Sequence, residues 1–353
     1  AVTLGTDRIV ASGKQAVSYT HTEEITIDED AVVSAATTFN ARQYNLGNLT
    51  VQNNAVLTLS SDVSAVGFQG VKIVAENLTI EAGSSISATG KGYARGNGPG
   101  AGVGGDSYKG SGGGYGGVGG TVSGGPGGLS YGSITAPVDL GSGGGGSQYG
   151  GSGGGAIHLE VGGTLRVDGS IVAGGGQADN YNYGGGSGGS IYLVVGTLLG
   201  SGPISANGAY RVNWENYTPG GGGAGGRIAV YYGTSGYTGT MSARGGPYSY
   251  SGGACSGGAG TIYVKSSSES HGRLRVDNGG VTLPSAPTPG SITTESTPLV
   301  TDLTLDELVV SGRGCVLVAA GTSVDVASLS LSLSGQLTNQ GTVVVGDLTS
   351  GDG

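Results

Sequence analysis

Alternating apolar and polar residues recur at a regular spacing through the middle of the chain. Four segments begin with a glycine tract and continue with apolar residues at every second position, starting at Ile157, Ile191, Ile228 and Ile262. These starts lie 34, 37 and 34 residues apart. Period-2 alternation is typical of half-buried strands. A repeat of this length is typical of a solenoid, in which each coil buries its apolar edge against its neighbours. The pattern therefore predicts an all-β solenoid.

The pattern divides the 353 residues into three regions of one body. Residues 1–70 contain strand-like pieces, and we expect them to cap the first coil. Residues 71–280 carry the solenoid repeats with their glycine-rich insertions. Residues 281–353 begin with a proline-marked loop and continue as shorter alternating strands, which we expect to be further solenoid rungs without insertions. Because the last residues resemble no polar cap, we expect the natural polypeptide to continue beyond Gly353.

Glycine accounts for 80 residues, and most of the glycine tracts fall at one place in each repeat. Between Lys91 and Gly155, 30 of 65 residues are glycine. Ordering glycine costs more backbone entropy than ordering any other residue, so an ordered tract needs a compensating interaction. Segments without Cβ atoms can lie close together. We therefore expect the insertions to stack on one side of the solenoid as extended, polyproline-II-like layers that share backbone hydrogen bonds.

Most of the aromatic residues lie in these insertions, which hold 11 of the 18 tyrosines and the only tryptophan. A phenol ring offers a flat apolar face and a hydrogen-bonding tip, which suits a sugar ring or a partner protein. The alternative is that the rings fill gaps between glycine layers as a secondary core. The candidate contact residues are Tyr93, Tyr108, Tyr115, Tyr131, Tyr149, Tyr181, Tyr183, Tyr210, Trp214, Tyr217, Tyr248 and Tyr250.

Strand alternation also predicts a row of residues on the outer face of the repeats. If Ile157 points inward, His158 points outward, and Tyr192 and Tyr263 occupy the same position in later repeats, with Ala229 between them. This outward ladder is either an exposed aromatic surface or an ordinary strand face covered by a neighbouring loop.

Charge and composition exclude several classes of function. The net charge is −9, with no basic stripe to neutralise phosphates, which argues against nucleic acid as a partner. No apolar run is long enough to span a membrane as a helix, so we expect no membrane insertion. The chain begins at Ala1 without a targeting segment, as a mature secreted protein or a domain cut from a larger one would.

Two cysteines, Cys255 and Cys315, are too few for a disulfide framework. They are either separate buried thiols or a disulfide that clips the last insertion to the following region. No metal-ligand spacing is present and no cofactor is expected. The acidic run of residues 28–30 could hold a calcium ion, or it is a solvated turn. No catalytic residue is assigned, because the candidate acids and bases form no recognisable pair. They are Asp106, Lys109, Asp139, His158, Asp168, Asp179, Arg211 and Glu215.

Two stretches carry a resemblance, ENLTIEAGSSISATGKGY and GSGGGGSQYGGSGGGAIHLEVGGTLRVDGSIVAGGG. Over about residues 45–280 the chain resembles the glycine-rich β-helical repeats of large secreted and cell-surface bacterial proteins. In composition its glycine tracts also look like the polyglycine layers of phage tail-fibre tip adhesins. The first resemblance implies a right-handed parallel β-helix and an extracellular location, and carries no catalytic residue across.

These observations favour a secreted or cell-surface protein with a structural or adhesive function. We expect it to contact polysaccharide or cell-surface glycan through the tyrosine-bearing insertions. One alternative is a subunit that joins end to end into an extracellular fibre, because an open strand edge is a template for pairing. The other is a polysaccharide lyase or glycoside hydrolase, which would need a cluster of acidic and basic residues in a cleft.

Overall fold

The computed structural model describes residues 2–5, 8–10, 24–27, 30–65, 67–104, 109–122, 125–146, 149–179, 182–209, 220–247, 256–280 and 296–351. These residues form an all-β structure without a helix. The strands are β1 Val2–Gly5, β2 Arg8–Val10, β3 Glu24–Ile27, β4 Ala31–Val33, β5 Thr37–Phe39, β6 Gln43–Val51, β7 Val56–Leu59, β8 Val71–Ile80, β9 Ser85–Ser87, β10 Ala156–Val167, β11 Ser170–Val172, β12 Ser190–Leu199, β13 Ile204–Ser205, β14 Arg227–Ser235, β15 Met241–Ser242, β16 Thr261–Ser266, β17 Gly272–Asp277, β18 Thr297–Leu299, β19 Leu303–Ser311, β20 Cys315–Val318, β21 Ser323–Ser332, β22 Gln336–Asn339 and β23 Thr342–Gly351.

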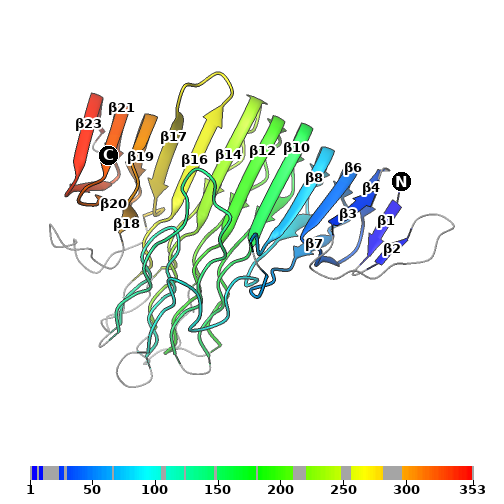
Figure 1. Ribbon diagram of the computed structural model, residues 1–353, viewed down its shortest axis with the longest axis horizontal. Coiled ribbons are helices and arrows are strands. Elements are labelled where there is room, and N and C mark those ends of the chain that lie inside the picture. Colours follow the sequence, from blue (N-terminus) through cyan, green and yellow to red (C-terminus); the bar gives the residue numbers. More distant parts are fainter. Residues whose placement is uncertain are drawn as a thin grey trace.

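One long sheet of 14 strands runs the length of the molecule (Figure 1). From β4 to β16 every neighbouring pair along its main path is parallel. A second sheet of six short strands, from β5 to β15, is also parallel. From β4 to β15 the chain alternates between the two sheets, so each strand of the long sheet in this part is followed by a short strand of the second sheet. A third sheet contains β18, β20 and β22.

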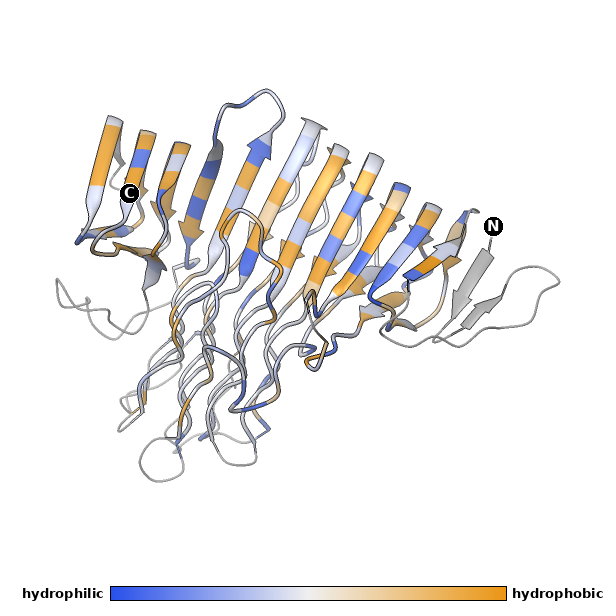
Figure 2. Cartoon of the chain, viewed as in Figure 1, coloured by the Kyte–Doolittle hydropathy of each residue, from blue (hydrophilic) through white to orange (hydrophobic). Residues whose placement is uncertain are grey.

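The predicted repeat positions coincide in the long sheet. Ile157 pairs with Ile191, Ile191 with Ile228, and Ile228 with Ile262 in the parallel register. These four isoleucines are buried and belong to one apolar cluster with residues of the second sheet. Each fully buried residue of this kind contributes about 1.5–3 kcal/mol to folding. Figure 2 shows the resulting alternation of apolar and polar positions along the long strands.

The strand direction reverses near the C-terminal part of the long sheet. Strands β16 and β17 are antiparallel, whereas β17, β19, β21 and β23 are parallel to one another. Only the turn 267–271 separates β16 from β17. A turn this short can join antiparallel neighbours, whereas parallel neighbours need a longer crossover. The alternating pattern predicts that the later strands continue the same solenoid, and the β16–β17 hairpin is where the structure differs.

The glycine-rich insertions connect the second sheet back to the long sheet and form a bundle that projects from β8–β16 (Figure 1). Segment 110–116 exchanges backbone hydrogen bonds with six other stretches, whereas a strand in a sheet has two neighbours. Donors to one neighbour recur every third residue. Gly110 and Gly113 donate to Asn182 and Gly185, and Ser111 and Gly114 donate to Val103 and Gly100. A three-residue repeat of this kind is typical of polyproline-II geometry.

The same three-residue repeat extends to segment 184–189. Gly185 and Gly188 donate to Gly221 and Ala224, while Gly186 and Gly189 donate to Gly176 and Ala173. The expectation that glycine segments lie side by side and share backbone hydrogen bonds is therefore confirmed. We call this set of segments, within residues 90–155, 173–189, 205–226 and 243–260 where described, the glycine bundle.

The bundle requires glycine because its backbones nearly touch. A Cβ atom added to Gly112 would lie 1.8 Å from the carbonyl oxygen of Gly222. At Gly186 it would lie 1.8 Å from the carbonyl oxygen of Ser152. Both obstacles are backbone atoms in a hydrogen-bonded neighbour, so no side-chain rearrangement can relieve the overlap. The close approach compensates for the entropy lost on ordering glycine.

Candidate functional site

Two of the candidate contact tyrosines lie inside the base of the glycine bundle. Tyr115 is fully buried, with its Oη 2.5 Å from Ser190 Oγ. The half-buried Tyr131 donates to the carbonyl oxygen of Leu140 and lies 2.7 Å from Ser142 Oγ. The two ring centroids are 4.8 Å apart. The expectation that Tyr115 contacts a ligand is therefore wrong. Its ring fills space that glycine leaves empty, as the secondary-core alternative proposed.

A buried arginine that the sequence analysis did not select holds these rings to the long sheet. Arg227 begins β14 and is 2% exposed. Its Nε donates to the carbonyl oxygen of Tyr131 at 3.0 Å, and its Nη1 donates to Thr261 Oγ1 at 3.1 Å. Its guanidinium carbon lies 5.6 Å from the Tyr115 ring centroid, within cation–π range. Burial lowers the pKa of Arg227, yet a guanidinium stays charged in proteins.

One sequence signal could have identified Arg227. The register places it between Ser190 and Thr261, with Ala156 beyond Ser190. An arginine at a register position where the neighbouring strands have small residues indicates that its side chain contacts something outside the sheet. The contact is with the long insertion, where the Tyr131 carbonyl oxygen accepts a hydrogen bond from Arg227 and the Tyr115 ring lies within cation–π range of the guanidinium.

Asp139 belongs to the same network as Arg227 and Ser190. Ser190 Oγ donates to the Asp139 carbonyl oxygen at 2.6 Å. Burial raises the pKa of the Asp139 carboxyl, and the charge of Arg227 opposes this rise. Asp168 is elsewhere, paired with Arg166. In the described part of the chain, no ion pair or hydrogen bond joins Asp139, Asp168 and His158.

Two tyrosine rings contact each other on the glycine bundle, and one of them is exposed. The ring centroids of Tyr149 and Tyr183 lie 5.3 Å apart at an angle of 47°. Tyr149 is 41% exposed and Tyr183 is half-buried. A Cβ atom on Gly146 would lie 1.9 Å from Cδ1 of Tyr183, so this ring rests directly on glycine backbone. We call Tyr149 and Tyr183 the tyrosine pair. Tyr93 is separate and donates its hydroxyl to Gln69 Oε1 at 3.0 Å.

The outward ladder has the predicted register. His158 pairs with Tyr192, Tyr192 with Ala229, and Ala229 with Tyr263. The His158 and Tyr192 rings stack with centroids 4.6 Å apart. Tyr231, two residues after Ala229, bridges the gap by contacting both Tyr192 and Tyr263.

A loop covers one end of this ladder. Tyr231 donates its hydroxyl to the carbonyl oxygen of Thr135 at 2.9 Å, and burial raises its pKa to about 12. Ile134 is in one apolar cluster with Ala229 and Tyr263, and Tyr263 is only 5% exposed. The covered-face alternative is therefore correct at Tyr263.

His158 lies within a small group of charged side chains. Its Nε2 is 3.3 Å from Glu160 Oε1 without forming a hydrogen bond to any described residue, and Lys72 Nζ is 2.8 Å from the same oxygen. Burial lowers the pKa of His158 to about 4, since desolvation and Lys72 outweigh the effect of Glu160. The ring is therefore neutral near pH 7, and its interactions are those of an aromatic packing residue.

An asparagine ladder ties the N-terminal strands of the long sheet together. Asn77 Nδ2 donates to Asn48 Oδ1 at 2.8 Å, and Asn48 Nδ2 donates to Asp30 Oδ1 at 2.7 Å. Asn77 Oδ1 accepts from the amide of Thr164 at 2.8 Å. Asp30, the last residue of the acidic run, therefore has a structural partner in the ladder.

Several predicted residues lie outside the described residues. They are Tyr108, Tyr181, Tyr210, Trp214, Tyr217, Tyr248, Tyr250, Cys255, Asp28, Glu29, Asp106, Arg211 and Glu215. Cys315 is buried in β20, and the proposed disulfide stays a prediction because Cys255 is among these residues.

Across the described ranges, no group of three or more His, Cys, Asp or Glu side chains could hold a metal ion. The same ranges contain no helix with the length and apolar character needed to cross a membrane. No family model matches the chain, and comparisons with curated proteins and with solved structures likewise gave no match.

Proposed function

We propose that the chain is a right-handed parallel β-helix of a secreted or cell-surface protein with a structural or adhesive function. The glycine bundle then serves as a stiff projection that presents the tyrosine pair to polysaccharide or cell-surface glycan. The exposed ring of Tyr149 and the half-buried ring of Tyr183 carry this proposal, because they contact each other and Tyr183 rests on the backbone of Gly146.

The chemistry of the pair supports a glycan ligand. Two phenol rings at 47° provide apolar faces against which the C–H face of a sugar can pack, and hydroxyl groups that bond sugar hydroxyls. Because the supporting backbone is already ordered by hydrogen bonds, binding costs little further loss of conformational entropy. Few charged residues are present in the chain, which favours a neutral or weakly charged partner over nucleic acid.

The test is a glycan array followed by pull-down on insoluble polysaccharides. The parent chain is compared with the double variant Tyr149→Ala/Tyr183→Ala. Losing both ring faces costs at least about 1.4 kcal/mol, which corresponds to binding that is weaker by tenfold or more. The double variant Tyr149→Phe/Tyr183→Phe keeps the faces and retains most of the binding.

Leu129→Ala is the matched control, because Leu129 is an exposed apolar residue of the long insertion outside the pair. It leaves binding unchanged. Loss of binding in all variants alike, or equal binding of the alanine variant and the parent, contradicts the proposed role of the pair. Oligosaccharides released into the supernatant would instead indicate a polysaccharide-cleaving enzyme.

A further inference from the structure

The hairpin β16–β17 exchanges the two faces of the long sheet. Across it, Ile262 lies opposite Arg275 and Val264 lies opposite Arg273. Directly opposed residues of an antiparallel pair point to the same face. The face that is the apolar interior up to β16 therefore continues onto β17 as a charged face.

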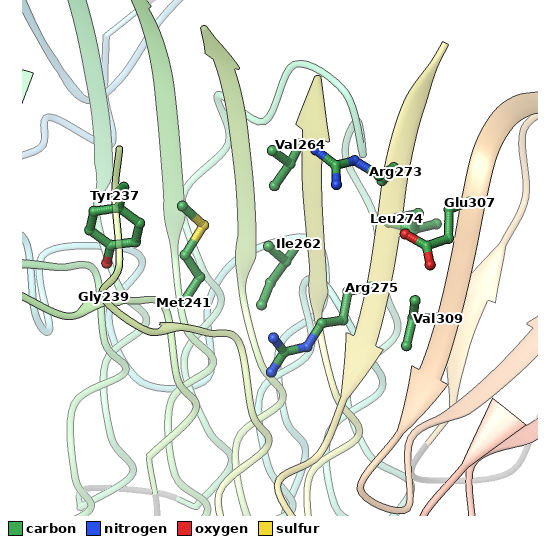
Figure 3. Close-up of a pocket in the computed structure, with 10 residues that line it drawn as sticks. All are labelled: Tyr237, Gly239, Met241, Ile262, Val264, Arg273, Leu274, Arg275, Glu307 and Val309. Atoms are coloured by element: carbon green, nitrogen blue, oxygen red, sulfur yellow. The ribbon is translucent and has the colours of Figure 1, made fainter. Parts of the chain in front are cut away.

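The second sheet does not follow the long sheet past this point. Within the described residues its last strand is β15, which contains Met241. Ile262 and Val264 consequently face a groove of about 290 Å³ in place of another short strand. Figure 3 shows Tyr237 and Met241 on one side of Ile262 and Glu307 on the other, with the Arg275 side chain reaching from β17 to below Ile262.

The groove has an apolar floor and a polar rim. Ile262, Val264 and Met241 form the floor, while both arginine side chains are 44% exposed at the rim. Arg273 Nε pairs with Glu269 at 3.0 Å, and Arg275 Nη2 pairs with Asp277 at 2.5 Å. Because Glu269, Asp277 and Glu307 outnumber the two guanidinium groups by one negative charge, the rim offers hydrogen-bond donors and acceptors without a net positive field.

This combination determines the chemical class of ligand. A neutral sugar ring has an apolar C–H face and a rim of hydroxyl groups that both donate and accept hydrogen bonds. An anion would find its cationic partners already paired, and a fully apolar ligand would strip water from the charged rim without replacing it. The volume of about 290 Å³ is near the lower limit of small-molecule sites, which suits a short stretch of glycan.

We propose that this groove is a binding site for a short stretch of neutral glycan, separate from the tyrosine pair. One sugar ring packs its C–H face on the half-buried side chains of Val264, Met241 and Tyr237. Its hydroxyls bond the guanidinium of Arg275 and the carboxylate of Glu307. The proposal does not depend on glycan binding by the glycine bundle.

Titration calorimetry and ligand-observed NMR on the whole chain test this site, with neutral gluco-, manno-, galacto- and xylo-tetrasaccharides as probes and tetragalacturonate as the acidic counterpart. At least one neutral probe binds, and more tightly than tetragalacturonate. Tyr237→Ala and Glu307→Gln each weaken binding by about tenfold. Arg275→Lys keeps an aliphatic side chain and its positive charge but loses the planar guanidinium group. It therefore weakens binding less than Arg275→Ala does.

Arg166→Ala is the matched control. Arg166 is an exposed arginine on β10 that pairs with Asp168, and it lies outside the groove. This variant retains full affinity, and so does Tyr149→Ala/Tyr183→Ala, which separates this site from the tyrosine pair. Thermal unfolding shows whether each variant is folded. The proposal is overturned if no neutral probe binds, if tetragalacturonate binds more tightly, or if folded Tyr237→Ala and Glu307→Gln chains bind like the parent.

Discussion

Tyr263 lies directly opposite Leu274 across the β16–β17 hairpin, and both belong to one apolar cluster. Tyr263 is on the outer face of the glycine-bearing repeats, whereas Leu274 is on the inner face of the C-terminal strands. The two parts of the molecule thus bury opposite faces of one continuous sheet. This exchange explains why the outward ladder ends in a buried tyrosine and why a groove opens on the other face.

Gly112→Ala is predicted to destabilise the chain by about 3 kcal/mol. The added methyl group would lie 1.8 Å from the Gly222 carbonyl oxygen, and backbone would have to move to relieve the overlap. Gly162→Ala is the control, since a Cβ there meets nothing within 4 Å. It changes stability by no more than about 0.5 kcal/mol. Denaturant unfolding measures both, and equal stabilities would contradict the close packing of the bundle.

Arg227→Met is predicted to lower the free energy of unfolding by about 2 kcal/mol. Methionine fills similar space but leaves the Tyr131 carbonyl oxygen and Thr261 Oγ1 without their donor. Arg166→Met removes an exposed ion pair with Asp168 and costs at most about 1 kcal/mol. Thermal unfolding compares the two variants. A larger loss for Arg166→Met would show that Arg227 does not anchor the insertion.

Protonation of His158 is predicted to reduce stability in acid. Its pKa is about 4 in the folded chain and near 6.5 when unfolded, so the unfolded state binds the proton more tightly between these values. The stabilisation from the neutral ring is complete above about pH 6.5 and falls as the pH decreases toward 4, by at most about 3 kcal/mol.

His158→Phe removes this contribution and flattens the pH dependence relative to the parent. Urea unfolding at several pH values measures the parent and the variant. Identical profiles for the parent and His158→Phe would contradict the lowered pKa.

Asn77→Ala is predicted to cost about 1–3 kcal/mol. It removes the acceptor of the Thr164 amide and the donor to Asn48, breaking the ladder between β6, β8 and β10. Asn97→Ala loses only a local bond to the carbonyl oxygen of Arg95 and changes stability by about 0.5 kcal/mol or less. Urea unfolding compares them, and a cost for Asn77→Ala no larger than that for Asn97→Ala would show that the ladder contributes nothing.

The parts of the fold that follow from local pattern were predictable. A glycine tract followed by alternation located Ile157, Ile191, Ile228 and Ile262 at equivalent positions, because period 2 assigns alternate residues to opposite faces. Alternation does not say which face is buried, however. Arg273, Leu274 and Arg275 therefore gave no warning that the chain turns back at β17 and buries the opposite face.

The site was less predictable because glycine carries no side-chain pattern. Tyr115 and Tyr149 stand in similar glycine-rich surroundings in the sequence, yet Tyr115 is buried and Tyr149 is exposed. Their difference depends on Ser190 and Arg227, which lie far along the chain and reach the insertion only in the folded structure. The groove depends on where the second sheet ends, a property that single strands do not encode.

The most direct test of the account is binding of the parent chain and of Tyr149→Ala/Tyr183→Ala to a glycan array. We expect the parent to bind a defined set of glycans, and the folded double variant to lose tenfold or more of the binding that Tyr237→Ala leaves intact. Equal binding by both chains, or no binding by the folded parent, would contradict the role of the tyrosine pair.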